Sequence, residues 1–176
     1  MVTQMPYKRI EEISSKLAAI ISNYIKENKL QLGKDIFFLF STDADHYGKD
    51  FNNAPFGEDK NAHKEATDLD KEIADKTFNG TLTDNKLRYL TNELWDTKDK
   101  KAKTLWCGRY PVPFGLMTTL KITKSLLDKN LNGKVVKYSD TYTEGVIPIK
   151  HTHLGLTAPF SLKHWVGFLS AGFYLK

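Results

Sequence analysis

Five consecutive apolar residues, Ile36 to Phe40, constrain the fold more than any other stretch of the chain. The run is short, and the polar segment Ser41–Gly48 follows it directly. A short unbroken apolar run is typical of a strand that is buried on both faces, in a sheet covered by helices. In open α/β sheets, ligands bind where such strands end. We therefore expect a functional site that includes Asp43 and His46, although a capped loop that happens to contain one histidine has the same spacing.

The composition fits one soluble domain, residues 1–176. Apolar residues make up 40% of the 176 positions and charged residues 27%, and the net charge is +5. The basic residues are mostly lysines, with arginine only at positions 9, 88 and 109. Because nucleic-acid readers combine arginine forks with aromatic platforms on a basic face, we expect no nucleic-acid partner.

Targeting signals and disulfides are not expected either. Cys107 is the single cysteine, so an intrachain disulfide is excluded and a reducing compartment is the simpler assumption. The first residues do not read as a secretory signal, and no apolar run reaches the length of a membrane span. We therefore expect a cytoplasmic protein with no membrane partner.

Helices and strands alternate along the rest of the chain. Apolar residues at three- and four-residue steps predict helices over 6–29, 62–77, 83–95 and 113–130, the third of them capped by Thr83. Runs of β-branched and aromatic residues predict strands at 135–138 and 165–175. The expected fold class is α/β, with a mixed sheet between two helical layers. His63, on the first turn of the second helix, is expected to be exposed.

A second group of chemically active residues lies at Cys107-Gly108-Arg109-Tyr110-Pro111. Cys107 stands shortly before a predicted helix, where the helix dipole favours a thiolate. It is therefore a candidate metal ligand or nucleophile, although a lone cysteine is most often a small buried residue.

Both groups resemble motifs of one family. Residues 41–48 resemble the Ser-Ser-Asp-x-x-His-[Trp/Tyr]-Gly element of the Memo family, known in prokaryotes as protein B of the AmmeMemoRadiSam set. Residues 107–111 resemble that family's Cys-Gly-[Arg/Tyr]-x-Pro motif, in the same order. The family is similar in fold to the class II extradiol dioxygenases, so the resemblance implies a metal-dependent redox or dioxygenase-like activity.

The resemblance also implies roles for individual residues. His46 would act as acid/base with Asp43 orienting its ring, and Cys107 would bind iron or copper, with zinc less favoured. Arg109 would hold an anionic substrate group, together with Tyr47 and Ser41.

Only the C-terminal half of the family is matched. The family's Pro-His-Ala-Gly-Tyr and Ser-His-His motifs are absent from these residues, so the expected metal site is incomplete and the chain could carry no cofactor. His151 and His153 could chelate an ion if both faced it, but two such histidines in a loop are more often unliganded. The alternatives are a non-catalytic module for a peptide or small anion, or a half-protein that forms a homo-oligomer or pairs with a separate N-terminal-half chain.

Overall fold

A four-stranded antiparallel sheet forms one layer of the molecule. The computed structural model describes residues 5–95, 103–145, 151 and 160–175. The strands are β1 (His46–Gly48), β2 (Gly80–Thr81), β3 (Leu131–Asp140) and β4 (His164–Leu175), in the order β1-β4-β3-β2. The long pair β3–β4 dominates the sheet, and its register shifts at a bulge between Val135 and Lys137.

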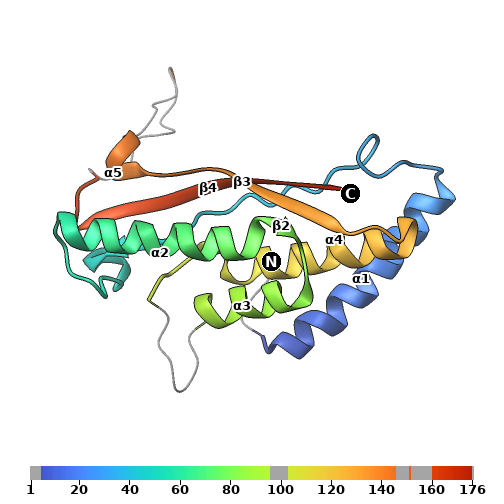
Figure 1. Cartoon of the computed structure of the whole chain (residues 1–176), viewed down its shortest axis with the longest axis horizontal. Helices are drawn as coiled ribbons and strands as arrows, with labels where there is room; N and C mark the ends of the chain where they lie inside the picture. Colours follow the sequence, from blue (N-terminus) through green and yellow to red (C-terminus); the bar gives the residue numbers. More distant parts are fainter. Residues whose placement is uncertain (1–4, 96–102, 146–150, 152–159, 176) are drawn as a thin grey trace.

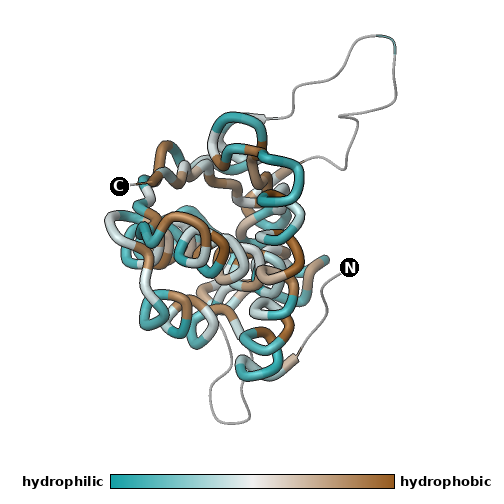
Figure 2. The backbone as a smooth tube through the Cα atoms, turned by 90° about the vertical axis from the view of Figure 1, so that its right-hand side faces the viewer, coloured by the Kyte–Doolittle hydropathy of each residue, from teal (hydrophilic) through white to brown (hydrophobic). Residues whose placement is uncertain are grey.

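The long helices lie together on one side of this sheet (Figure 1). They are α1 (Tyr7–Glu27), α2 (Lys60–Phe78), α3 (Asp84–Leu94) and α4 (Pro111–Leu127). A short helix, α5 (Thr141–Glu144), follows β3, and two 3-10 turns, η1 (Lys49–Phe51) and η2 (Cys107–Arg109), follow β1 and precede α4. Hydrophobic and hydrophilic residues alternate along the helical turns (Figure 2), the pattern of helices with one face in the core.

Local sequence explains where the helices begin. The Asp59 carboxylate accepts a hydrogen bond from the Ala62 N–H (2.8 Å) at the start of α2. The Thr83 hydroxyl accepts one from the Lys86 N–H (3.3 Å) at the start of α3. Each side chain satisfies a helix-terminal N–H that otherwise lacks a partner. Pro111 occupies the first turn of α4, where a missing N–H has no consequence.

The main core fills the space between the helices and the inner face of the sheet. Its buried members come from every layer and include Ile73, Phe78, Leu87, Leu90, Trp106 and Leu116. Tyr47 and Trp165 form a separate buried stack, with ring centroids 4.9 Å apart. None of the described helices is both long and apolar enough to span a bilayer.

The sequence predicts the helices and the C-terminal strands well, and the α/β class is confirmed. The expected layering is wrong. All pairings in the described sheet are antiparallel, and among the described residues no long helix covers its second face (Figure 1). Antiparallel sheets commonly leave one face solvated in this way.

The prediction of a central buried strand at Ile36–Phe40 is also wrong. These residues form no strand, and Phe37 and Leu39 are 76% and 89% exposed. Ile36 and Phe38 pack instead against a small core between α1 and α4. The unbroken apolar run therefore reflects an extended segment with one side against helices, without a strand neighbour.

Candidate metal centre

Two distant segments of the chain meet at the start of β1. The His46 N–H donates to the Leu105 carbonyl oxygen (3.1 Å), and the Gly108 N–H donates to that of Asp43 (3.2 Å). These backbone bonds hold the polar segment after residue 40 beside the cysteine motif, although 61 positions separate His46 from Cys107. The two sequence motifs thus contribute to a single site.

Three side chains converge there. His46 Nε2 lies 3.1 Å from Cys107 Sγ and 3.4 Å from Asp43 Oδ2. All three ligand atoms lie within 4.8 Å of one another. The His46 side chain is 20% exposed and that of Asp43 51%, so the cluster opens to solvent on one side.

The spacing and the donor types fit one metal ion. Bond lengths typical of thiolate, imidazole and carboxylate ligands, set at tetrahedral angles, place neighbouring ligand atoms about 3.4–3.6 Å apart. Two of the three separations, 3.1 and 3.4 Å, are close to this range, and all three ligand atoms lie within 4.8 Å of one another. A sulfur, nitrogen and oxygen donor set suits iron, copper or zinc, and three protein ligands leave a coordination position open, as in catalytic centres.

The same geometry does not favour a thiolate nucleophile. Burial raises the pKa of the Cys107 thiol, the negative charge of Asp43 raises it further, and Arg109 opposes them. Asp43 and Cys107 both face Nε2 of His46, so Asp43 does not orient the ring through the opposite nitrogen, as the expected acid/base arrangement requires. A bound cation would reverse this balance by stabilising the thiolate.

Glycines allow the close approach of these segments. A Cβ at Gly108 would lie 2.9 Å from the Cγ2 atoms of both Thr42 and Val112. Gly48 has a φ of +121°, and a Cβ there would lie 2.0 Å from the Lys163 carbonyl oxygen. Both positions therefore require glycine, one for space and the other also for its backbone conformation.

An aromatic wall borders the cluster. The Phe51 ring meets His46 edge-on, with ring centroids 4.9 Å apart. The centroid of the same ring lies 4.8 Å from that of the His164 ring. His164 Nδ1 is 2.9 Å from the Asp50 carboxylate. η1 thus supplies both an apolar surface beside His46 and an ion-pair partner for a second imidazole.

The expected substrate-binding residues occupy different environments. Arg109 is half-buried beside the cluster, its guanidinium donates to the Trp106 carbonyl oxygen (2.9 Å), and it lies 5.1 Å from the Tyr110 ring centroid. Ser41 is exposed. Tyr47 is fully buried, and its hydroxyl donates to the Gly57 carbonyl oxygen (2.9 Å), so it belongs to the core and does not face a substrate.

Only one of the two loop histidines lies within the described residues. His151 is exposed and does not belong to the group of described residues whose ligand atoms converge with Cys107. His153 lies outside the described residues. The idea that they supply metal ligands remains a prediction.

Two buried acids next to the site were not anticipated. Asp45 and Asp70 are both fully buried. Burial raises the pKa of Asp45 to about 8, and the charge of Asp70 contributes. Burial likewise raises the pKa of Asp70 to about 6, against the opposing effect of hydrogen bonds from the Trp106 indole, Thr104 and Tyr138. The sequence offers no signal that separates these two from exposed aspartates.

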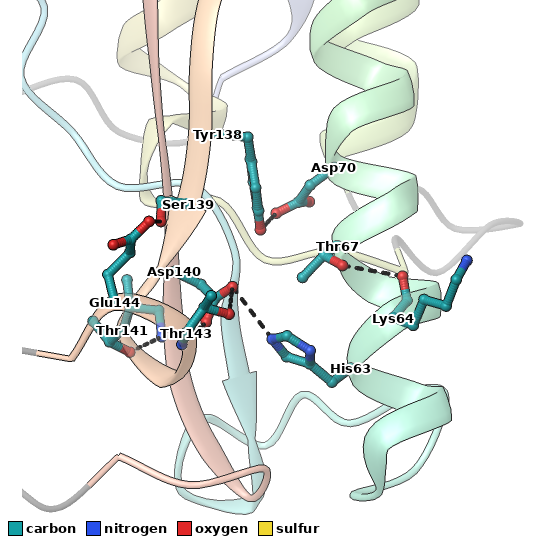
Figure 3. A network of polar contacts seen from close by, with 11 residues as sticks. His63, Lys64, Thr67, Asp70, Tyr138, Ser139, Asp140, Thr141, Thr143 and Glu144 are labelled. Carbon is teal, nitrogen blue, oxygen red and sulfur yellow. Dashed lines mark hydrogen bonds and ion pairs between the residues drawn. The ribbon is translucent and has the colours of Figure 1, made fainter.

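A polar contact outside the cluster links α2 to the end of β3 (Figure 3). His63 Nε2 lies 3.3 Å from Asp140 Oδ2, and the His63 ring meets Trp165 edge-on. Asp140 also accepts a hydrogen bond from the Thr143 N–H (2.8 Å), which caps α5. The prediction that His63 is exposed is therefore wrong. Its side chain is only 16% exposed and lies against Asp140.

Comparison with known proteins returns no relative. No protein-family model matches the sequence, and no match was found among curated proteins or solved structures. The functional argument therefore depends on the geometry of this chain.

Proposed function

We propose that this protein is a metal-dependent redox or dioxygenase-like protein, in which Asp43, His46 and Cys107 bind one iron or copper ion. The observation that carries the proposal is the convergence of three different ligand atoms within 4.8 Å. The motif resemblance to the Memo family supports the same assignment, since it implies a metal ligand at Cys107. On the basis of this geometry we propose Asp43 and His46 as further ligands, in place of the expected orienting and acid/base roles.

The neighbouring residues have distinct tasks in this proposal. A bound ion would supply redox chemistry at its open coordination positions. The positive charge of Arg109 stabilises the Cys107 thiolate and is placed to attract an anionic substrate group. The Phe51 ring shields one side of His46 from water.

Metal content tests the proposal. Protein purified without a histidine tag is reconstituted anaerobically with Fe²⁺, Cu⁺ or Zn²⁺, desalted and measured by inductively coupled plasma mass spectrometry. We expect near-stoichiometric iron or copper in the wild type, and loss of most of it in Cys107→Ala and His46→Ala. His164→Ala is the matched control, because it removes a nearby imidazole that is outside the cluster, and it should retain the ion. No bound metal in the wild type, or metal that both cluster variants retain, would refute the assignment.

The same measurement decides whether the loop histidines complete the site. In a His151→Ala/His153→Ala variant, unchanged stoichiometry and affinity would remove them as ligands. A reduced affinity would add them to the three residues of the cluster.

A further inference from the structure

Most of the outer edge of β4 has no strand neighbour in the part of the chain that the structure describes. β1 pairs only with His164, Trp165 and Val166. Gly167 makes the last bonds to this side, accepting from the Ala44 N–H and donating to the Asp45 carbonyl oxygen, both at 2.8 Å. Within the described residues, no backbone hydrogen bond joins 36–43 to 168–175. The edge of β4 is therefore open from residue 168 to its end.

The direction of the free backbone groups follows from their neighbours. Successive residues of a strand point their N–H and C=O groups to opposite edges. Because Gly167 points outward, Leu169, Ala171, Phe173 and Leu175 do so too. β3 gives an independent check: Val135, opposite Ala171, directs its N–H away from β4, to the Asn79 side chain (2.8 Å). The open edge therefore presents donors and acceptors at every second residue.

A cavity of about 610 Å³ lies along this edge. Its wall opposite β4 is the extended segment 36–44, and Leu116, Thr119 and Thr123 of α4 also line it. Asp43 is the sole charged residue among the described residues that line the cavity. The occupant must therefore be largely apolar.

The wall opposite β4 is also unpaired. Residues 37–42 take part in no backbone–backbone hydrogen bond within the described chain. Phe37 and Leu39 are highly exposed along this segment. A small apolar molecule would fill the volume, but it would leave the backbone groups on both walls without partners. An extended polypeptide satisfies them, because it carries its own donors and acceptors on both edges.

We propose that the cavity between β4 and residues 36–44, called the groove below, binds an extended, uncharged strand of a second polypeptide. This strand would have aliphatic side chains at every second residue. The strand would add to the edge of β4, a known mode of peptide recognition. The stretch from Leu169 to Leu175 accommodates a strand of about 23 Å at 3.3 Å per residue. Its inward side chains would lie over Leu116 and Thr119, and docking would cover Phe37 and Leu39. Asp43, one of the proposed metal ligands, also lines this cavity, but the strand binding proposed here does not require a bound ion.

Peptide selection tests the groove. A phage-displayed library of random peptides is selected on the wild-type protein, and enriched sequences are resynthesised with capped ends and titrated by calorimetry. We expect enriched peptides with an aliphatic residue at every second position. N-methylation of the alternate peptide nitrogens that face β4 should weaken binding by at least about tenfold, about 1.4 kcal/mol, because it removes backbone donors and keeps the side chains.

Variants of the protein locate the binding. Ala171→Pro removes an outward N–H without breaking the ladder to β3, and Leu39→Asp puts a charge on the rim at an exposed position that the fold does not need. Each should weaken peptide binding by at least about tenfold. Val136→Asp is the matched control, an exposed position outside the groove, and should leave affinity unchanged. Circular dichroism confirms that each variant is folded.

Four results would overturn the proposal. The first is the absence of any enriched peptide. The second is peptide binding that neither Leu39→Asp nor Ala171→Pro weakens. Decanoic acid binding that excludes the peptides would assign the groove to a small apolar ligand. A dimer seen by light scattering and dissociated by Leu39→Asp would assign it to a second copy of the chain. Metal content should not change in Leu39→Asp, so failure of this proposal and failure of the metal centre are distinguishable.

Discussion

Replacing Asp70 by Asn should remove a pH-dependent loss of stability. Asp70 is fully buried, and its pKa is raised from 3.8 to about 6. The folded protein therefore holds this proton more tightly than the unfolded chain does. The contribution of this bound proton to the unfolding free energy is fully present below about pH 4 and is lost as the pH rises through 6. A difference of about two pKa units corresponds to about 3 kcal/mol above pH 7. Asp45, with a pKa raised to about 8, extends the loss to higher pH.

Urea unfolding followed by tryptophan fluorescence, on metal-free protein between pH 4.5 and 8, measures this effect. The unfolding free energy of the wild type should fall across the range. The unfolding free energy of Asp70→Asn should fall less, by about 2 kcal/mol between pH 4.5 and 8, because about a third of the contribution of about 3 kcal/mol is already lost at pH 4.5. Asp68→Asn is the control on the same helix, since this exposed carboxyl pairs with Lys64, which lowers its pKa. A wild-type stability that is constant or rises over this range, or an equal slope in Asp70→Asn, would refute the reasoning.

Three further predictions follow from the geometry. Gly48→Ala should destabilise the protein by about 2–3 kcal/mol, seen as a lower melting temperature, because its φ is +121° and a Cβ would overlap neighbouring backbone. Iodoacetamide should alkylate metal-free Cys107 more slowly at pH 7 than it alkylates a model thiol peptide, and Asp43→Asn should speed the reaction, because the pKa of the thiol is raised partly by that charge. In hydrogen exchange by NMR, the outward N–H of Ala171 should exchange faster than that of Gly172, which points to β3; equal protection would contradict an open edge.

Local sequence was sufficient for features set by near neighbours. The apolar period of α1 and the cap at Thr83 appear in the structure where they were expected. The motif resemblance also implied that His46 and Cys107 belong to one site, and their side chains lie 3.1 Å apart. These inferences needed only periodicity, capping and motif order.

Features set by distant partners could not be predicted. The run Ile36–Phe40 is compatible both with a buried strand and with an unpaired segment that packs against helices. Its apolar character is the same in both cases. Asp43 and Asp45 illustrate the same limit on a smaller scale. They lie two positions apart in one polar segment, yet Asp43 is half exposed and Asp45 fully buried. The difference comes from Leu105, 60 positions away, whose N–H donates to Asp45.

The burial of Asp45 is understandable from what it holds in place. Its Oδ1 accepts hydrogen bonds from the Leu105 N–H (2.6 Å) and the Asn53 amide (2.9 Å), while Oδ2 has no hydrogen-bond partner within the described chain. A carboxyl buried in this way lowers stability, and an apolar side chain of similar size would avoid the desolvation. Such a side chain could not accept the Leu105 N–H, which fixes the cysteine segment beside His46. The stability cost is therefore located at the contact that sets the distance between two proposed ligands, where positional accuracy matters more than stability.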